Sequence, residues 1–384
     1  MVQKPSETLN LIAVIPKISY NIDMLRNSYN RFFPMPDFLV PSSFGLDISD
    51  ESIKFARIIG AKNGIKIGQY GERKIPVGVI ESGKIKDQKQ LEQILLSLKK
   101  EEGIKSVRVS LPEEQVYLFR LLLDKTGLQN VREGIELALE EHVPIPAPDA
   151  IFDYELLSET PENLELQVAA IPKNVIESYL SVFKSSMIQV QSCELEAQAT
   201  SRAVVKKGDM ETYMIVDFGQ TRTGIFIISR GVAVFTSTLD DVGGVMLMKV
   251  IQKSFNISYE EAEKMKKDYG LERNGPNKEI FSVLLNIVSI LRDEMVKHFI
   301  YWHTHKDEEG KDRPPIKKVI LCGGESNLKG LTEYFSVSMK IPVELANVWT
   351  NINDTAKDIP EISFNKSLTF ATTFGLALGD FDYD

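Results

Sequence analysis

The chain has 384 residues, and at about 150 residues per domain this length predicts two or three domains. Its 45 Lys and Arg against 54 Asp and Glu leave a net charge of −9, which argues against a broad nucleic-acid-binding surface. Two cysteines, Cys193 and Cys322, are too few for a disulfide scaffold or a four-cysteine zinc site and are typical of a reducing compartment.

Nothing in the sequence predicts direct insertion into a membrane. No stretch approaches the roughly 18 apolar residues that a spanning helix needs. The first residues lack the basic segment and the small-residue cleavage site of a secretory signal. We therefore expect a cytoplasmic protein that reaches a membrane only through a partner.

The N-terminal 42 residues are expected to form an extension and linker. A short apolar run is followed by a stretch punctuated by Pro34, Pro36 and Pro41, and proline both removes a backbone donor and restricts the residue before it. The pattern then changes. Three β-prone runs separated by turn residues predict an antiparallel meander: FGLDIS, IKFARIIG and IKIGQYGERKI.

The following segment mixes strands and helices. A strand is predicted in VGVIESGKI, and Leu91, Leu95 and Leu98 then recur at the spacing of one helix face. Further strands are predicted in VRVSLP and QVYLFRLLL, a helix in NVREGIELALEEHV, and a hairpin in IFDYELLS and LELQVAAIP. A helix over 173–183, a strand near 188–194 and a helix from residue 197 complete the first half.

The second half repeats the plan of the first. YMIVDFGQTRTGIFI, like FGLDISDESIKFARI, has a hydrophobic strand that ends in Asp, then a small polar turn and a second strand. This self-similarity at about half the chain length predicts two related domains. Helices are predicted over 244–300, followed by the strand KKVILCGG, the helix LKGLTEYFSVSM, the strand PVELAN and the Gly-punctuated helix TFATTFGLALG.

Three turns could bind a ligand. Asp47 and Asp217 each precede a turn of small or hydroxyl-bearing residues, whose backbone N–H groups can hold phosphate oxygens. A carboxylate beside phosphates suits Mg²⁺ bound through its water shell. An ordinary hairpin would explain either turn alone, so it is the pairing that predicts a nucleotide held from both sides. Gly323 and Gly324, after the strand VIL, would let a flat ligand approach the backbone.

Five segments in order resemble the nucleotide-binding segments of the actin-like ATPase superfamily: GLDISDESIKF, ELEAQATSRA, VDFGQTRTGIFI, VILCGGESNLKGL and FATTFGLALG. Others resemble the PilM family of type IV pilus assembly proteins, so that the likeness runs from Phe44 to Gly379: VRVSLPEEQVYLFRLLL, EHVPIPAPDAIFDYELL, VAAIPKNVIESYL, DDVGGVMLMKVI and FNISYEEAEKMKKDYGL. The resemblance implies an α/β, actin-like (ribonuclease H-like) fold with two related domains around a nucleotide cleft. We expect an extension (1–42), a first domain (43–200, with an insert at about 77–160), a second domain (201–360) and a returning C-terminal helix (361–384).

The resemblance also implies roles for individual residues. Asp47 and Asp217 would be the catalytic acids and would hold Mg²⁺ through water, and Glu196 would orient water or metal. The expected nucleotide contacts are Ser49, Ser52 and Lys54 in the first turn, Gly219, Thr221 and Thr223 in the second, then Gly243, Gly244, Gly323, Gly324 and Glu325, and finally Glu260, Glu263, Lys264 and Lys267 on a helix that borders the ribose and base. Those four residues would equally suit a solvated helix face supported by ion pairs.

The family pattern is broken at two positions. Ser49 stands where the family usually has Gly, and Glu325 places a charge beside a ligand that is itself anionic. Phosphoryl transfer depends on metal, positioning and electrostatics, and no residue stands out as a base that activates water. The sequence therefore predicts binding of ATP and Mg²⁺, with slow or no hydrolysis.

The implied function is that of a cytoplasmic pilus assembly protein, peripheral to the inner face of the cytoplasmic membrane. It would hold the cytoplasmic tail of a PilN-like inner-membrane protein in a groove of domain 1, with the nucleotide state biasing the grip. Other pilus motor components and self-association stay open. The alternatives are an FtsA-like cell-division actin homologue, a pseudo-ATPase scaffold and a small-molecule kinase on the same fold. The acidic end DFDYD fits poorly with the membrane-binding helix that ends FtsA-like chains.

One further hypothesis concerns the extension. Residues 9–12, Leu-Asn-Leu-Ile before Pro16, resemble the INLLP motif of the PilN tail. They would occupy the same groove in cis or in a neighbouring copy. A disordered or casually docked leader is the alternative.

Overall fold

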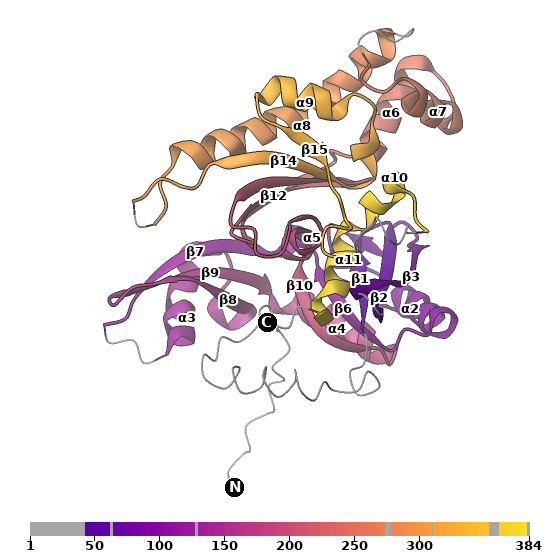
Figure 1. The fold of residues 1–384 in the computed structure, drawn as a ribbon. Helices are drawn as coiled ribbons and strands as arrows, with labels where there is room; N and C mark the ends of the chain where they lie inside the picture. The colour runs from indigo at the N-terminus through magenta and orange to yellow at the C-terminus, as the bar shows by residue number, and fades with distance from the viewer. Residues whose placement is uncertain are drawn as a thin grey trace.

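The computed structural model describes residues 43–61, 64–126, 130–272, 278–308, 310–352 and 361–381. The extension, and with it the hypothesis on residues 9–12, lies outside the described residues. Two five-stranded sheets form the framework (Figure 1). The first, in the order β10-β6-β1-β2-β3, has β1 (Phe44–Ile48), β2 (Ser52–Ala61), β3 (Gly64–Lys74), β6 (Ser106–Leu111) and β10 (Gln189–Leu195). The second, in the order β13-β12-β11-β14-β15, has β11 (Thr212–Phe218), β12 (Arg222–Ser229), β13 (Val232–Asp240), β14 (Ile316–Cys322) and β15 (Val343–Leu345).

The two sheets repeat one topology. β1 pairs antiparallel with β2 and parallel with β6, and β11 pairs antiparallel with β12 and parallel with β14. The meander expected at the start of the chain is confirmed, because β1, β2 and β3 are consecutive antiparallel neighbours. The repeat expected from the sequence therefore places the turn after Asp47 and the turn after Asp217 at equivalent ends of the two sheets.

Helices cover both faces of each sheet. The outer face of the first sheet packs on α2 (Gln88–Glu102) and α4 (Lys173–Ser185). The outer face of the second packs on α6 (Gly244–Phe255), α7 (Tyr259–Tyr269), α8 (Lys278–Thr304) and α9 (Leu331–Met339). The predicted helix face of α2 is confirmed, since Leu91, Leu95 and Leu98 are all buried.

Two helices, α5 (Glu196–Val204) and α11 (Ala371–Leu378), lie between the sheets (Figure 1). Strand side chains alternate between the two faces of a sheet. Met214 and Val216 of β11 accordingly join the outer core, whereas Tyr213 and Ile215 join the core around α5 and α11. α11 also contacts β1 and β2, so the C-terminal segment returns to the first sheet. Burial of this shared layer holds the two sheets together.

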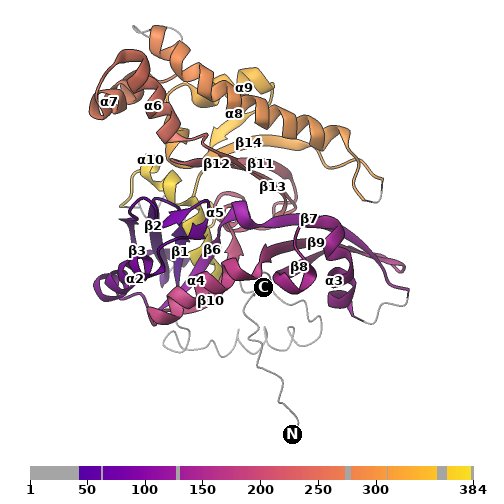
Figure 2. The same ribbon diagram turned by 180° about the vertical axis from the view of Figure 1, so that it is seen from behind.

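A third sheet carries the strands β7 (Tyr117–Asp124), β9 (Asn163–Pro172) and β8 (Ala150–Glu159) in that order, and α3 (Val131–His142) packs on it. The predicted β8–β9 hairpin is confirmed. β7 lies against β13 of the second sheet (Figure 2). Because α2 packs into the core of the first sheet and not into that of the third, we propose to draw the inserted subdomain at 117–172, narrower than the 77–160 expected from the sequence.

The remaining elements are short. The strand predicted in VGVIESGKI is present only as β4 (Ile80–Glu81) and β5 (Lys84–Ile85), joined through Ser82 and Gly83 at positive φ. The short helices are η1 (Glu113–Gln115), η2 (Ala147–Asp149), η3 (Gly324–Asn327), α10 (Phe364–Ser367), η4 (Leu368–Phe370) and η5 (Gly379–Phe381). None of the helices within the described part of the chain is long and apolar enough to cross a membrane.

Candidate functional site

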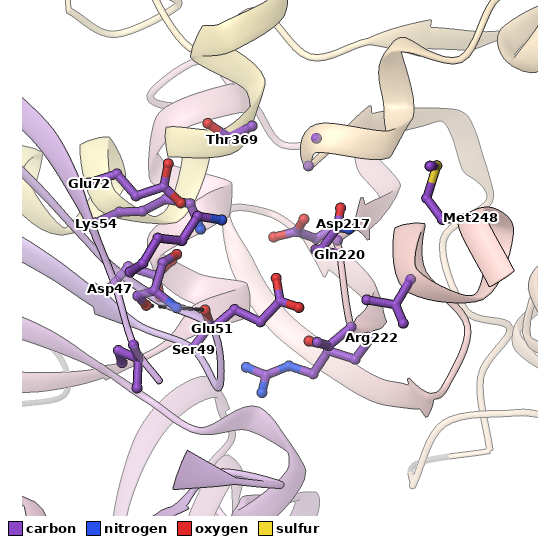
Figure 3. Close-up of a pocket in the computed structure, with 18 of the residues that line it drawn as sticks. Asp47, Ser49, Glu51, Lys54, Glu72, Asp217, Gln220, Arg222, Met248 and Thr369 are labelled. Atoms are coloured by element: carbon purple, nitrogen blue, oxygen red, sulfur yellow. Dashed lines mark hydrogen bonds between the residues drawn. The ribbon is translucent and has the colours of Figure 1, made fainter. Parts of the chain in front are cut away.

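A cleft of about 680 Å³ lies between the two equivalent turns, and residues of both sheets line it. Figure 3 shows Asp47 and Lys54 on one side of the open space and Asp217 and Gln220 on the other. Of the residues expected to contact a nucleotide or metal, ten line this cleft: Asp47, Ser49, Ser52, Lys54, Glu196, Asp217, Gly219, Thr221, Gly323 and Gly324.

The two expected phosphate turns have the same backbone geometry. Ser49 N–H donates to the Ser52 carbonyl at 2.9 Å, and Gly219 N–H donates to the Arg222 carbonyl at 3.1 Å. Each bond begins two residues after the Asp that is the next-to-last residue of the strand. The first turn is tightened further, because Ser49 Oγ donates to the Ser52 carbonyl and accepts from Ser52 N–H. Serine in place of the family's usual glycine therefore closes this turn on itself.

The two carboxylates have different surroundings. Asp47 Oδ1 accepts a hydrogen bond of 2.8 Å from Ser110 Oγ on the neighbouring strand β6. Burial, and then the negative charge of Asp47, raise the pKa of Asp217 to about 6. Two neighbouring carboxylates repel each other when both are ionised, and a cation placed between or beside them stabilises the doubly ionised pair. The donor set thus fits a hard, oxygen-seeking ion such as Mg²⁺.

Cationic side chains surround the turns. Lys54 is in register with Asp47 on the antiparallel β1–β2 pair and lines the cleft. Lys74 and Lys249 also line it, although neither was predicted from the sequence. Such ammonium groups fit the anionic phosphates of a nucleotide. Lys74 is the last residue of β3 and pairs with Ser52 of the first turn. Extending the predicted register of the meander from β2 to β3 would have identified it as a candidate for contact with phosphate.

The glycine turn after β14 is required by the close packing of two strands. Gly323 has φ 87°, and a β-carbon built there would lie 2.4 Å from Asp217 Oδ1. Glu325 does not line the cleft. Its carboxylate pairs with Lys266 Nζ at 2.7 Å, and both side chains are largely buried. The negative charge expected beside an anionic ligand is therefore neutralised.

Three further expected contacts serve to pack the second turn. Thr223 is fully buried, and its Oγ1 donates to the Val242 carbonyl at 2.5 Å. Gly244 N–H donates to the Gly219 carbonyl at 3.1 Å. A β-carbon on Gly243 would lie 2.6 Å from the Gln220 carbonyl oxygen. Thr223, Gly243 and Gly244 stay outside the cleft lining and hold the N-terminus of α6 against the turn.

The expected charged contacts on α7 do not reach the cleft. Glu260, Lys264 and Lys267 are exposed, and Glu263 pairs with Lys267 at 3.1 Å on the helix surface. The inward face of α7 is the one that carries the buried Ala262 and, one turn later, Lys266. Tyr259, at the start of α7, lines the cleft instead, together with Met248 and Gln252 of α6 and Thr369 of η4. The run EEAEKMKK has charged residues on every face of the helix. Its sequence therefore does not predict which face packs against the rest of the second domain.

A buried charge cluster at the base of the cleft was also missed. Arg222 donates through Nη2 to Glu196 Oε1 and through Nη1 to Glu114 Oε1, both at 2.6 Å. Burial lowers the pKa of Arg222, but Glu196 and Glu114 outweigh it and raise the pKa above its ordinary value. The only signals in the sequence were an arginine within a small polar turn and the paired acids of LPEEQ.

Glu113, beside Glu114, is expected to make stability depend on pH. Burial raises its pKa from 4.5 to about 7, against the opposing effects of hydrogen bonds with Ala197 and Thr236 and of the charge of Arg222 on β12. Between these values the unfolded chain loses the proton while the folded chain keeps it, so the free energy of unfolding falls as pH rises from about 4.5 to 7 and stays reduced above 7. Glu113→Gln removes this loss. The free energy of unfolding of Glu113→Gln relative to wild type should therefore increase across that pH window. The difference should reach about 3 kcal/mol, at roughly 1.36 kcal/mol per pKa unit.

Urea unfolding of both proteins at a series of pH values measures this difference. Glu113 Oε2 accepts from Ala197 N–H at 3.4 Å, a bond that the Gln carbonyl oxygen can still accept. Glu133→Gln, on the exposed surface of α3, is the control and should show little change. A stability difference for Glu113→Gln that is the same at every pH would contradict the prediction.

One family model matches this chain, and similar solved structures share its fold. A family model described as type IV pilus assembly protein PilM matches residues 45–381. A chain from the "PilM-PilN type IV pilus biogenesis complex" is 19% identical with a TM-score of 0.72, over 89% of this chain and 99% of that one. The ethanolamine utilization protein EutJ from Carboxydothermus hydrogenoformans is 18% identical with a TM-score of 0.51, over 90% and 91%. MreB5 of Spiroplasma citri, bound to AMPPNP, is 15% identical with a TM-score of 0.51, over 86% and 93%. These likenesses show the actin-like ATPase fold that the sequence predicted.

Proposed function

Because the chain belongs to the PilM family of type IV pilus assembly proteins, we propose that it is a cytoplasmic, ATP-binding assembly protein that holds the tail of a PilN-like inner-membrane protein. The observation that carries the nucleotide part is the pair of equivalent turns that place Asp47 and Asp217 across one cleft. The partner part is supported by the likeness to a chain from a PilM–PilN complex. The family match favours this function over the FtsA-like alternative.

The residues of the cleft fit a magnesium nucleotide. Backbone N–H groups of the two turns, with Lys54 and Lys249, would hold phosphate oxygens. Asp47 and Asp217 would hold Mg²⁺ through its water shell, and the ion would neutralise phosphate charge. Gly323 and Gly324 would leave room for the adenosine to approach the backbone. Met248 and Tyr259 line the same half of the cleft as Gly323 and Gly324 and supply apolar surface there.

Hydrolysis is expected to be slow or absent. Glu196 is the carboxylate best placed to orient water, but its Oε1 already accepts from Arg222 Nη2 at 2.6 Å. Burial, opposed by the charge of Arg222, raises the pKa of Glu196, but taking a proton from water would also give up this charge-assisted bond. Binding of the nucleotide, and not its turnover, is therefore the property that we propose for this cleft.

Isothermal titration calorimetry with Mg-ATP tests the nucleotide part. Asp47→Ala combined with Asp217→Ala should weaken binding at least about tenfold, which corresponds to roughly 1.4 kcal/mol, because the cation loses both carboxylates. Lys267→Ala, which changes an exposed residue outside the cleft, should bind like wild type. Absence of Mg-ATP binding in the wild type would leave the pseudo-ATPase scaffold.

The partner part needs a second titration, with a synthetic peptide that carries the INLLP motif of a PilN cytoplasmic tail. We place this peptide in a groove of the first domain and expect its affinity to differ between nucleotide-free and Mg-ATP-bound protein. A peptide that does not bind would contradict the pilus function even if ATP binds. Equal affinity in the two states would refute nucleotide control alone.

A further inference from the structure

The short helix η1 (Glu113–Gln115) connects the first sheet to the third, because β6 ends at Leu111 just before it and β7 begins at Tyr117 just after it. It also packs against β13 of the second sheet. Any displacement of η1 would therefore be passed directly to the strand that opens the inserted subdomain. The contacts of η1 with the two phosphate turns decide what could displace it.

The second turn contacts η1 through Arg222. Its guanidinium spans two carboxylates that belong to different elements: Glu196 at the start of α5 and Glu114 in η1, each at 2.6 Å. Arg222 and Glu196 line the cleft, whereas Glu114 does not. The exposed fractions of the Arg222 and Glu114 side chains are 15% and 7%, so their bond is largely shielded from water.

The first turn contacts η1 through the β4–β5 turn. Asp50, in the β1–β2 turn, accepts from Ser82 N–H at 2.9 Å and from Gly83 N–H at 3.2 Å. The Ser82 carbonyl in turn accepts from Gln115 Nε2 at 3.0 Å. The β4–β5 turn is held in place by Tyr179, whose hydroxyl donates to the Gly83 carbonyl at 3.0 Å. Both phosphate turns are thus linked to the same three-residue helix.

The charges around η1 are not balanced. Arg222 donates to the carboxylates of both Glu114 and Glu196, while Glu114 Oε2 has no hydrogen-bond partner among the described residues. A phosphate group in the cleft would compete for the donors of Arg222, since a guanidinium binds phosphate and carboxylate in the same geometry. Each donor turned toward phosphate leaves Glu114 with less compensation, and a buried carboxylate without compensation is strongly disfavoured.

We propose that η1 couples phosphate occupancy of the cleft to the inserted subdomain, with Arg222 and Glu114 as the positioning residues that carry the coupling. This inference rests on the proposed nucleotide binding and adds the route by which it acts. The two states differ in one contact, the Arg222–Glu114 pair, and that difference supplies the differential interaction that coupling requires. By linkage, a ligand that shifts η1 or β7 also changes the affinity of the cleft for nucleotide.

Hydrogen exchange read by mass spectrometry tests the coupling without any partner. The probe is the non-hydrolysable analogue AMPPNP with Mg²⁺, added to the full chain at saturation. In the wild type, exchange should change in both phosphate turns and also in β7. A change in β7 of about fivefold or more is expected, the lower end of ordinary coupling between sites. In Glu114→Gln the turns should still respond and most of the response of β7 should disappear, because only the link through Ser82 and Gln115 remains.

Glu165→Gln is the matched control. Glu165 forms another buried pair, with Arg120 at 3.2 Å, whose side chains are 12% and 15% exposed. This pair joins β9 to β7 and has no contact with either phosphate turn, so its loss should leave the response of β7 intact. Gln115→Ala, which cuts only the link through Ser82, should reduce the response in part and gives a second variant that keeps the charges unchanged.

The possible outcomes distinguish a failure of the coupling from a failure of nucleotide binding. No change in the turns of the wild type would overturn nucleotide binding and the coupling together. A change in the turns with none in β7 would overturn the coupling alone. So would a full β7 response in Glu114→Gln. If Glu114→Gln does not fold, the wild type and Gln115→Ala decide by the same criteria.

Discussion

Gly375→Ala is expected to destabilise the protein by about 3 kcal/mol or more, at the upper end of what single substitutions do. Alanine is the better helix former by about 1 kcal/mol, so propensity alone predicts the opposite sign. A β-carbon on Gly375, however, would lie 1.7 Å from the carbonyl oxygen of Ala199 in α5. The added methyl group would clash with the backbone of α5, and a backbone cannot move aside as a flexible side chain can.

The position of α11 leaves it little room to shift. Its other side meets β1, where a β-carbon on Gly45 would lie 2.2 Å from the Thr373 carbonyl oxygen. Arg202 of α5 also donates to the Gly375 carbonyl at 2.8 Å. Because the α5–α11 layer is shared by the cores of both sheets, separating the two helices should loosen the cleft as well.

Thermal and urea unfolding measure the cost of Gly375→Ala, and Mg-ATP titration shows its effect on the cleft. Gly60→Ala is the control, because a β-carbon on Gly60 meets no atom within 4 Å. That variant should keep wild-type stability. A Gly375→Ala protein as stable as wild type would show that α5 and α11 can slide apart at little cost.

Arg222→Met is expected to cost about 3–5 kcal/mol, the range found when one partner of a buried ion pair is removed. Methionine has a similar length but donates no hydrogen bond, so Glu114 and Glu196 would both stay buried without their cation. The loss should be largest at high pH, where both carboxylates are charged. Urea unfolding near pH 8 and near pH 5 measures it.

The triple variant Arg222→Met, Glu114→Gln, Glu196→Gln isolates the cause. Neutralising the whole cluster should restore most of the stability, since a buried ion network replaced by uncharged groups of similar volume is often no less stable. Lys267→Met, which breaks the exposed pair with Glu263, should change stability little. A triple variant as unstable as Arg222→Met would mean that lost packing, and not uncompensated charge, causes the effect.

Local patterns in the sequence predicted most of the secondary structure. The spacing of Leu91, Leu95 and Leu98 located α2 and its buried face, because the period of a helix is set by the backbone alone. The strands β11 and β14 were recognisable as apolar runs, and their two faces meet two different cores. The strand expected in VGVIESGKI was wrong in extent: two-residue strands flank a turn at Ser82 and Gly83.

By itself the sequence determined the family, the repeated strand–Asp–turn plan and the place of Asp47 and Asp217 in a shared cleft. These properties are local or recur along the chain, so residue type and spacing are enough to reveal them. Only the tertiary structure decided which face of α7 turns inward.

The tertiary structure also paired Arg222 with Glu114, which is 108 positions away. Such a pair depends on how strands from two sheets are brought together. In the sequence, Arg222 and Glu114 are ordinary charged residues that could equally have faced water. The net charge of −9 does not reveal this cluster. A sum over the chain cannot show that several acidic residues surround one buried arginine.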